Sequence, residues 1–469
     1  MHKSARDELA ITLLCEKVYH VGKFDSHFVE EKLSDQLNLD SPEFAVPEAN
    51  RIAVNNYPSQ MMPIPASRMF EIKKALVTYK QNFGADAPAY DASQGDGGAS
   101  LPGVPAGILE RAYHLQVEHG TAYDMPYGTD LFRKVTAEQY WQLDSSSGWG
   151  PNNIIFVQGG RDGLNKAYSA MIALGYGNVG DALVVSRVPW VSYNWGPYGL
   201  GLNVLYAPGR PEEGWRYTPE NIKLTAEYAK AQGRNIAGIV ITSPDNPTGR
   251  TIPVEEQIAL AKAALENGIA YVLFDWIYHW VTDGGHNDIN AVLGSFTPDE
   301  RKHLIFLDGI TKSLGGSNVR SAHLVADESV VKYVNTVASH GIVPSFYAQA
   351  VAIAAYEMGF EKAAAPIIEP CKLSRQVMRE VLGKSDTPYI MGDGYYSFID
   401  CTRYIEAGGF GDSGGLGTYL GEKFGITVVP GVHFSKAGAN WVRFSYALPS
   451  VITQKAITRF YEGLASLIK

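Results

Sequence analysis

Lys312 is the residue whose surroundings most strongly suggest chemistry, because it follows the apolar run 304–307 in a polar, glycine-rich segment. Asn246 opens an Asn-Pro-Thr-Gly turn after another apolar run, and Asp275 and Tyr278 follow a third. A lysine alone indicates little, since most lysines are solvated surface residues. A lysine beside a buried strand, with these polar groups arriving from neighbouring strand ends, is suited to forming a Schiff base with a carbonyl compound.

The elements that must position these residues follow from an alternation of short apolar runs and helical patterns between about residues 153 and 326. Each run is apolar at consecutive positions, which is typical of strands buried on both faces in a mostly parallel sheet with helices on either side. Ligands bind at the carboxyl ends of such strands, so we expect the polar motifs to meet at one sheet edge. The runs are 154–157, 182–185, 236–241, 271–274, 304–307 and 322–325.

The pattern changes after about residue 346. A long helical stretch is followed by short strands, a glycine-rich segment at 407–417 that we expect to be a loop, and a terminal helix. A helix predicted at 67–81 is expected to pack with this part of the chain. The fold class is therefore α/β, with a large domain whose sheet is mostly parallel and flanked by helices, plus a smaller α+β domain built from both chain ends. The expected limits are 1–60 for an N-terminal extension of unknown role, 61–118 and 346–469 for the small domain, and 119–345 for the large, cofactor-binding domain.

Composition excludes several classes of protein. The 469 residues are 45% hydrophobic and 19% charged, which is enough to bury a large core. A formal net charge of −9 argues against broad binding to nucleic acid or to an anionic membrane. The three cysteines form no paired motif, so we expect no disulfide framework, no metal site and a reducing compartment. No segment has the pattern of a signal peptide or a membrane span, and a cytoplasmic location is the expectation.

From about position 64 onward, the order and spacing of these motifs resemble the fold-type I, class I/II aminotransferase superfamily of pyridoxal phosphate enzymes. The resemblance implies pyridoxal 5′-phosphate as cofactor and a mostly parallel sheet of the seven-stranded type. It implies that Lys312 forms the Schiff base and then shuttles the Cα proton. Asp275 would pair with the pyridine nitrogen and keep the ring protonated, so that the ring withdraws electrons. Asn246 and Tyr278 match the donors to the cofactor 3′-oxygen.

The same resemblance assigns the phosphate and ring contacts. Gly159 and Gly160 lead into a predicted helix, whose first amides would meet the phosphate. Arg320, eight residues after Lys312, resembles the family's phosphate arginine, and Arg161 is expected to offer the phosphate a further cation. Trp190 matches the aromatic residue that stacks on the pyridine ring.

Substrate and partner contacts are also implied. Arg443 corresponds to the arginine that holds the substrate α-carboxylate, Asn246 would contact the substrate as well, and Gly95 belongs to a segment that lines the substrate side. Tyr123 resembles the tyrosine that reaches the phosphate of the partner subunit, which implies a homodimer with active sites at its interface. Three aromatic residues either line a side-chain pocket or belong to the core: Tyr193, Trp195 and Tyr198.

Transamination between an L-amino acid and a 2-oxo acid, by way of pyridoxamine phosphate, is the function that this resemblance favours. The alternative is a non-transaminating biosynthetic relative that performs β- or γ-elimination, replacement, decarboxylation or cyclisation, with S-adenosylmethionine as one candidate substrate. Gly309, Gly316 and Val319 depart from the common signature and leave that alternative open.

A third class consists of transcription regulators in which an aminotransferase-like domain follows a DNA-binding module. The charge of residues 1–60 argues against such a module. They carry six Lys and Arg against ten Asp and Glu. DNA-binding modules have the opposite balance.

Overall fold

The computed structural model describes residues 49–50, 68, 72–231, 233–282 and 287–468. The expected extension at 1–60 lies outside the described residues, apart from the two-residue strand β1, Ala49–Asn50. Over the described ranges, no helix combines the length and the apolar character needed to cross a membrane.

The largest element is a sheet of eight strands in the order β1-β5-β4-β6-β7-β8-β9-β3. Strands β4 to β8 are paired in parallel, whereas β9 is antiparallel to both of its neighbours and β1 is antiparallel to β5. The expectation of a mostly parallel α/β sheet is therefore confirmed. The strands after β1 are β3 (Ile154–Val157), β4 (Ala182–Val185), β5 (Asn203–Tyr206), β6 (Ile236–Thr242), β7 (Val272–Asp275), β8 (Leu304–Gly309) and β9 (Ala322–Ala326).

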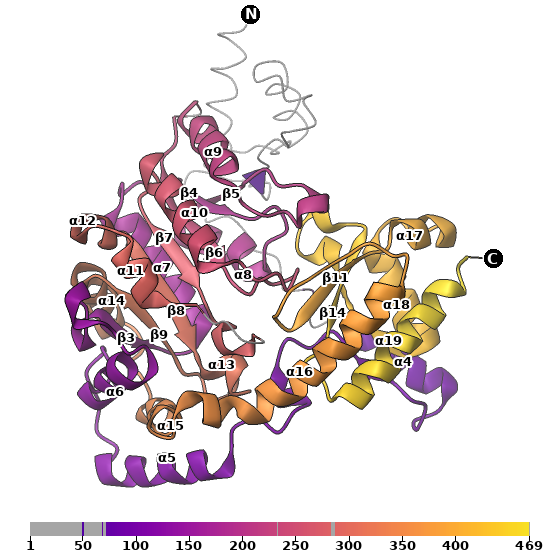
Figure 1. Cartoon of the computed structure of the whole chain (residues 1–469), viewed down its shortest axis with the longest axis horizontal. Coiled ribbons are helices and arrows are strands. Elements are labelled where there is room, and N and C mark those ends of the chain that lie inside the picture. The colour runs from indigo at the N-terminus through magenta and orange to yellow at the C-terminus, as the bar shows by residue number, and fades with distance from the viewer. Residues whose placement is uncertain (1–48, 51–67, 69–71, 232, 283–286, 469) are drawn as a thin grey trace, which may run out of the picture.

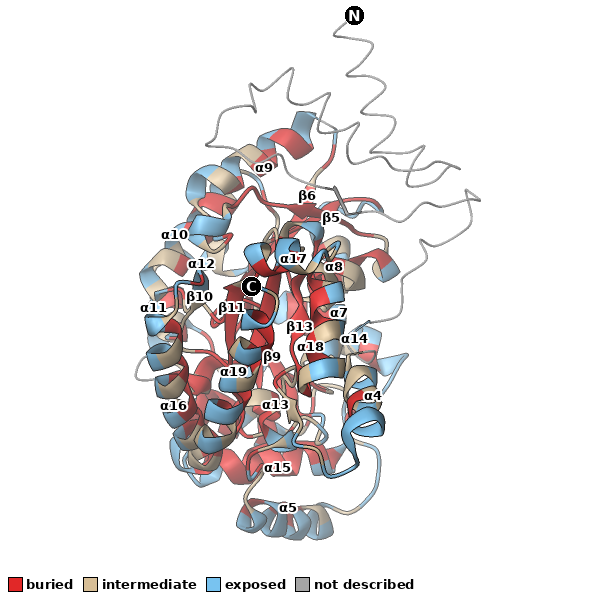
Figure 2. Ribbon diagram, turned by 90° about the vertical axis from the view of Figure 1, so that its right-hand side faces the viewer, coloured by how far each residue is buried: buried red, intermediate tan, exposed pale blue. Residues whose placement is uncertain are grey.

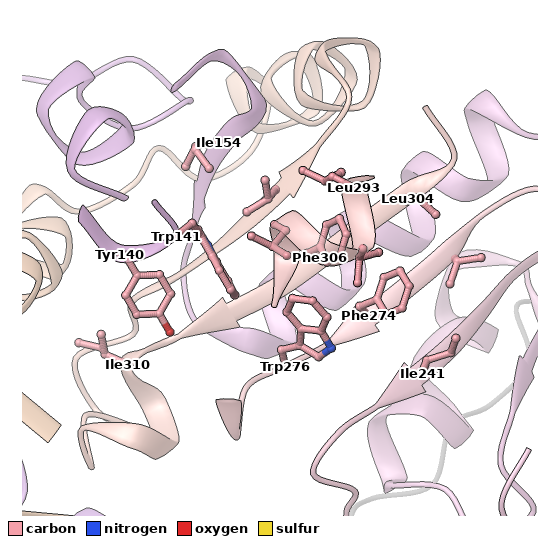
Figure 3. Close-up of a cluster of buried hydrophobic side chains, with 14 of the residues drawn as sticks. Tyr140, Trp141, Ile154, Ile241, Phe274, Trp276, Leu293, Leu304, Phe306 and Ile310 are labelled. Carbon is pink, nitrogen blue, oxygen red and sulfur yellow. The ribbon is translucent and has the colours of Figure 1, made fainter. Parts of the chain in front are cut away.

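Alternate side chains of these strands enter two different hydrophobic clusters, one on each face of the sheet. Ile154 and Phe156 of β3 belong to the first cluster, and Ile155 and Val157 belong to the second. Figure 3 shows the first cluster, in which Phe274, Trp276 and Phe306 are gathered. Burial on both faces explains why the strand sequences are apolar at consecutive positions.

Helices cover both faces, and the strands between them are buried (Figure 2). The second cluster includes residues of α7 (Gly160–Leu174) and α14 (Glu328–Ser339). The first cluster includes residues of α9 (Pro219–Ala231), α10 (Val254–Glu266) and α11 (Ile289–Gly294). It also includes residues of α5 (Ala106–His119), α6 (Asp130–Val135) and α15 (Phe346–Glu357).

Local signals account for several helix starts. Thr297 caps α12 (Pro298–Arg301): its hydroxyl accepts from the Glu300 amide, and the Glu300 carboxylate accepts from the Thr297 amide. A reciprocal pair of this kind satisfies two backbone donors that the first helical turn would otherwise leave free. Asp288 begins α11 in a similar way, because its carboxylate accepts from the amides of Asn290 and Ala291.

The C-terminal part contains a second, antiparallel sheet in the order β10-β11-β14-β13. Its strands are β10 (Tyr389–Met391), β11 (Tyr396–Asp400), β13 (Val429–Pro430) and β14 (Trp441–Ser445). A short parallel pair joins β2 (Tyr90–Asp91) to β12 (Ile426–Thr427). The helices that accompany these two small sheets are α4 (Lys73–Phe83), which comes from the N-terminal part of the chain, and α16 (Phe360–Lys384), α17 (Thr402–Gly408), α18 (Ser413–Phe424) and α19 (Ser450–Ala465). Figure 1 shows α16 running from α15 to this second group of elements.

The prediction of a loop at 407–417 is wrong, because α17 and α18 occupy most of this range. Asp412 caps α18 by accepting hydrogen bonds from the amides of Gly414 and Gly415. Within the expected range, Gly417 packs closely against β13, because a Cβ there would lie 3.0 Å from the Cγ of Pro430. Gly421, one turn further along α18, approaches α4, where a Cβ would lie 2.4 Å from the Cβ of Ala75. Capping and close packing of the helix therefore account for glycines that by themselves suggested a loop.

Candidate active site

A cavity of about 770 Å³ opens where the large sheet faces the second sheet, and ten of the predicted site residues line it. Five of them follow different strands of the large sheet: Gly160 follows β3, Trp190 β4, Asn246 β6, Tyr278 β7 and Lys312 β8. This agrees with the expectation that ligands bind at the carboxyl ends of the strands. The predicted residues in the lining are Gly95, Gly160, Arg161, Trp190, Asn246, Asp275, Tyr278, Lys312, Arg320 and Arg443.

Lys312 lies in the short helix α13 (Ile310–Ser313), directly after β8. Its ammonium group donates a hydrogen bond to the carbonyl oxygen of Gly95. Burial lowers the pKa of Lys312 to about 8, although the Asp96 carboxylate acts in the opposite direction. A buried lysine with a lowered pKa supplies more of the neutral amine, which is the form that attacks a carbonyl group.

Asp275 ends β7 and is almost completely buried, with 2% of its surface exposed. The Tyr193 hydroxyl donates to one of its carboxylate oxygens at 2.6 Å, and the amide of Ile277 donates to the other at 3.1 Å. Burial raises the pKa of Asp275 to about 6 in spite of these hydrogen bonds. The carboxylate is therefore oriented, and a cation placed beside it would stabilise its ionised form.

Asn246 and Arg443 are joined by a hydrogen bond in the lining of the cavity. Arg443, in β14, donates to the Asn246 side-chain oxygen at 2.8 Å and to the carbonyl oxygen of Ser93 at 2.8 Å. Its guanidinium carbon lies 4.2 Å from the ring centroid of Tyr396. The Nε of Arg443 is buried and has no hydrogen-bond partner in the described part of the chain. An unpartnered buried guanidinium nitrogen is typical of a site that awaits an anion.

Another part of the cavity lining is built around the start of α7. Gly159 has a φ of +83°, and a Cβ there would lie 2.3 Å from a guanidinium nitrogen of Arg320. Arg320 itself has a φ of 62°, a region that non-glycine residues seldom adopt. Its guanidinium group donates to the carbonyl oxygens of Ser317 at 2.7 Å and Gln158 at 3.2 Å. The Arg161 guanidinium carbon lies 5.4 Å from the Trp190 ring centroid.

This cavity carries a positive charge although the whole chain is negative. Its lining contains five cationic side chains and two anionic ones, all within the described residues. A helix N-terminus adds further positive potential beside Arg320. The lining therefore fits a ligand with a phosphate group and a substrate with carboxylate groups. The five cations are Lys73, Arg161, Lys312, Arg320 and Arg443, and the two anions are Asp96 and Asp275.

Two predicted residues do not line the cavity. Gly159 adjoins it through its contact with Arg320. Tyr123 lies elsewhere, with 95% of its surface exposed, beside a surface depression lined by segments 120–124 and 343–346. Its expected contact with a partner subunit stays a prediction.

The sequence did not single out several residues that the fold brings to the site. The sequence leaves open whether Tyr193, Trp195 and Tyr198 line a pocket or belong to the core. In the structure Tyr193 lines the cavity, whereas Trp195 and Tyr198 do not. Tyr396 and Asp96 were not predicted at all, although both lie in the lining. The only signal for Asp96 was its position directly after Gly95, and nothing in the sequence of its strand distinguishes Tyr396 from the neighbouring Tyr395.

A lysine, an aspartate and a tyrosine, presented to one cationic cavity at the carboxyl edge of a mostly parallel sheet, define a class of enzymes that uses pyridoxal phosphate. The model of the protein family described as "Aminotransferase class I and II" matches residues 118–460 of this chain. The chain belongs to this family, and it is a pyridoxal-phosphate-dependent aminotransferase by that membership.

Two curated relatives and one solved structure illustrate the similarity. The aspartate aminotransferase of Bacillus subtilis (strain 168) is 26% identical over 363 residues, which cover 76% of this chain and 87% of that enzyme. The aspartate/prephenate aminotransferase of Thermus thermophilus is 25% identical over 366 residues, with the same shares. An aminotransferase structure from Mycobacterium tuberculosis superimposes with a TM-score of 0.73 at 20% identity, covering 86% of this chain and 97% of that one.

Proposed function

We propose that this enzyme binds pyridoxal 5′-phosphate in the cavity around Lys312 and transfers an amino group from an acidic L-amino acid to a 2-oxo acid. The observation that carries the proposal is the convergence of Lys312, Asp275 and Tyr278 on one cationic cavity. When bound, the cofactor supplies an aldehyde that takes the amino group and a ring that withdraws electrons. The chain's own residues bind the ligands, orient them and move the proton.

Each residue has a task that follows from its setting. Lys312, with its lowered pKa, is the amine that holds the cofactor and afterwards carries the proton between the substrate Cα and the cofactor. Asp275, fixed by Tyr193, is the anion that stabilises a protonated ring nitrogen. Arg320 and the amides at the start of α7 are the phosphate donors. Trp190 provides the flat apolar surface against the ring.

Arg443 is the residue we assign to the substrate α-carboxylate. Two of the five N–H groups of an arginine are engaged with Asn246 and Ser93, which leaves Nε and its neighbours for a carboxylate. Because Asn246 accepts from Arg443, substrate binding at the arginine is linked directly to a donor expected at the cofactor 3′-oxygen.

Arg161 supports the preference for an acidic amino acid. Once Arg320 is assigned to the phosphate and Arg443 to the α-carboxylate, Arg161 is a further cation in the lining, and its guanidinium group lies near the Trp190 ring. Relatives named as aspartate and aspartate/prephenate aminotransferases agree with a second carboxylate on the substrate. We propose that Arg161 binds that second carboxylate.

A single-turnover experiment tests the function. The cofactor-loaded enzyme is mixed with individual L-amino acids and no oxo acid, and the 2-oxo acid formed is counted against the number of sites. We expect one equivalent, formed at lower donor concentration with L-aspartate or L-glutamate than with L-alanine. Ammonia, an elimination product or a cyclised product without an aminated cofactor would instead support the non-transaminating alternative.

The Arg161→Gln variant, with Arg161→Lys as its matched control, separates the two roles open to that arginine. If Arg161 binds the substrate, the glutamine variant raises the KM for L-aspartate about tenfold or more and leaves the KM for L-alanine unchanged. The lysine variant keeps most of the discrimination. A weaker affinity for pyridoxal phosphate, with unchanged discrimination, would assign Arg161 to the phosphate.

We also propose that the enzyme is a homodimer in which Tyr123 reaches the partner's site. Tyr123 is exposed close to other exposed apolar side chains of α5, the loop after it, the segment before α15 and the first turn of α15, and an extended apolar surface of this kind is typical of an interface. Sedimentation analysis should give twice the mass of the chain, and Tyr123→Phe should weaken cofactor binding. A fully active monomer would contradict this proposal. The exposed side chains are Tyr113, Val117, Met125, Ile342 and Tyr347.

A further inference from the structure

The buried hydroxyl groups of Tyr278 and Tyr396 lie 2.7 Å apart, and the two residues come from different sheets. Tyr278 follows β7 of the large sheet, whereas Tyr396 is the first residue of β11 in the small one. Both side chains line the cavity. A hydrogen bond therefore joins the two parts of the molecule at the site itself.

The position of Tyr396 is fixed on several sides. Its carbonyl oxygen accepts from the Tyr446 hydroxyl at 3.1 Å, and Gly249 packs so closely that a Cβ there would lie 1.9 Å from the same oxygen. Its hydroxyl lies against Gly95, where a Cβ would be only 2.6 Å away. Arg443 covers its ring. The hydroxyl thus has little freedom to point elsewhere.

Hydrogen-bond direction follows from the number of protons available. Each phenol has one proton to donate. If Tyr278 donates its proton to the cofactor 3′-oxygen, the proton between the two tyrosines must come from Tyr396. A hydroxyl that accepts a hydrogen bond becomes a stronger donor, because chains of hydrogen bonds polarise one another.

We propose that Tyr396 is a positioning residue that acts through Tyr278, directing the Tyr278 proton to the cofactor 3′-oxygen and making Tyr278 a stronger donor. This inference rests on the proposed function. A stronger donor withdraws negative charge from the 3′-oxygen, and that charge otherwise favours the protonated imine formed with Lys312. Tyr396 therefore keeps the imine pKa lower than Tyr278 alone would.

The test is a spectrophotometric titration of the cofactor-loaded protein without substrate, in which the absorbance of the cofactor reports the imine pKa. We expect Tyr396→Phe to raise the midpoint by about half a unit, the size of one modest hydrogen bond. Tyr278→Phe should raise the midpoint further. Adding Tyr396→Phe to Tyr278→Phe should change nothing more, because the residue through which Tyr396 acts is already gone.

Tyr446→Phe is the matched control, because it removes a buried hydroxyl that contacts the backbone of Tyr396 but lies outside the cavity lining. It should leave the midpoint unchanged. An unchanged midpoint in Tyr396→Phe, or the same shift with and without Tyr278, would overturn the inference. If the parent protein shows no cofactor band that depends on Lys312, the proposed function itself fails instead.

Discussion

The Tyr193 hydroxyl donates a 2.6 Å hydrogen bond to the Asp275 carboxylate and accepts one of 3.1 Å from the Thr242 hydroxyl. The single proton of Tyr193 is therefore committed to Asp275. This chain of three side chains holds the carboxylate in one orientation and favours its ionised form.

Tyr193→Phe should raise the pKa of Asp275 above its present value of about 6, because a hydrogen bond that stabilises the charged form is lost. In the pH profile of kcat/KM, the acid limb should move upward by about half a unit to one unit. Thr242→Val serves as a graded control, since it removes only the hydrogen bond to Tyr193, and its shift should be smaller. An acid limb that does not move in either variant would remove Tyr193 from this role.

Asp275→Asn should stabilise the cofactor-free protein at neutral pH while abolishing most of its activity. The folded pKa of about 6 lies above the ordinary 3.8, so the folded state binds more protons between these values and loses stability as the pH rises through about 6. The loss is about 3 kcal/mol, from about 1.4 kcal/mol for each pKa unit. Urea unfolding at about pH 4 and about pH 8 should show a gain for the variant only at the higher pH. Equal gains at both pH values would contradict a pKa of Asp275 raised by burial.

Lys312 should react with the cofactor aldehyde at a lower pH than an ordinary lysine. Burial brings its pKa from 10.5 to about 8, so the rate of imine formation in cofactor-free protein should rise through about pH 8 and then level off. In Asp96→Asn the midpoint should fall further, because the Asp96 carboxylate raises the Lys312 pKa in the parent. A rate that rises only near about pH 10 would indicate a solvated amine.

Gly249→Ala should destabilise the protein by more than about 2 kcal/mol, because a clash adds to backbone strain. Gly249 has a φ of +74°, and its Cβ would lie 1.9 Å from the Tyr396 carbonyl oxygen. Gly359→Ala is the control for strain alone, since Gly359 has a φ of +86° and no atom within 4 Å of the new Cβ. Chemical unfolding should give about 1 kcal/mol for the control. Similar losses for both variants would show that the Asn246 turn can move away from β11.

The large sheet was predictable because burial on both faces leaves consecutive apolar residues in each strand. Besides the two-residue strand β1, the strand β5 was not predicted from the sequence. Strand β5 begins with Asn203, whose side chain is buried and donates to the Gly180 carbonyl oxygen, so the apolar run is interrupted by a satisfied polar group. The helix α18 was mistaken for a loop for a related reason: its glycines serve close packing, which composition alone does not distinguish from turn formation.

The predicted site residues gathered as expected where each follows a strand, since parallel strands end at one edge. The residues that hold them in place could not be found in this way. Tyr396 is 118 positions from Tyr278 in the sequence, and Tyr193 is 82 positions from Asp275. Contacts between such distant positions depend on how two sheets and their connecting helices pack, and a single sequence carries no local signal for them.

The most direct test of the central claim is to locate the imine and follow its loss when the donor is added. The cofactor-loaded enzyme is reduced with borohydride and digested, and the modified lysine is identified by mass spectrometry, before and after saturation with L-aspartate in the absence of any oxo acid. We predict an adduct on Lys312 before the donor is added and almost none after it, because the amino group has been transferred to the cofactor. An adduct on another lysine, or one on Lys312 that no amino acid removes, would contradict an aminotransferase built around Lys312.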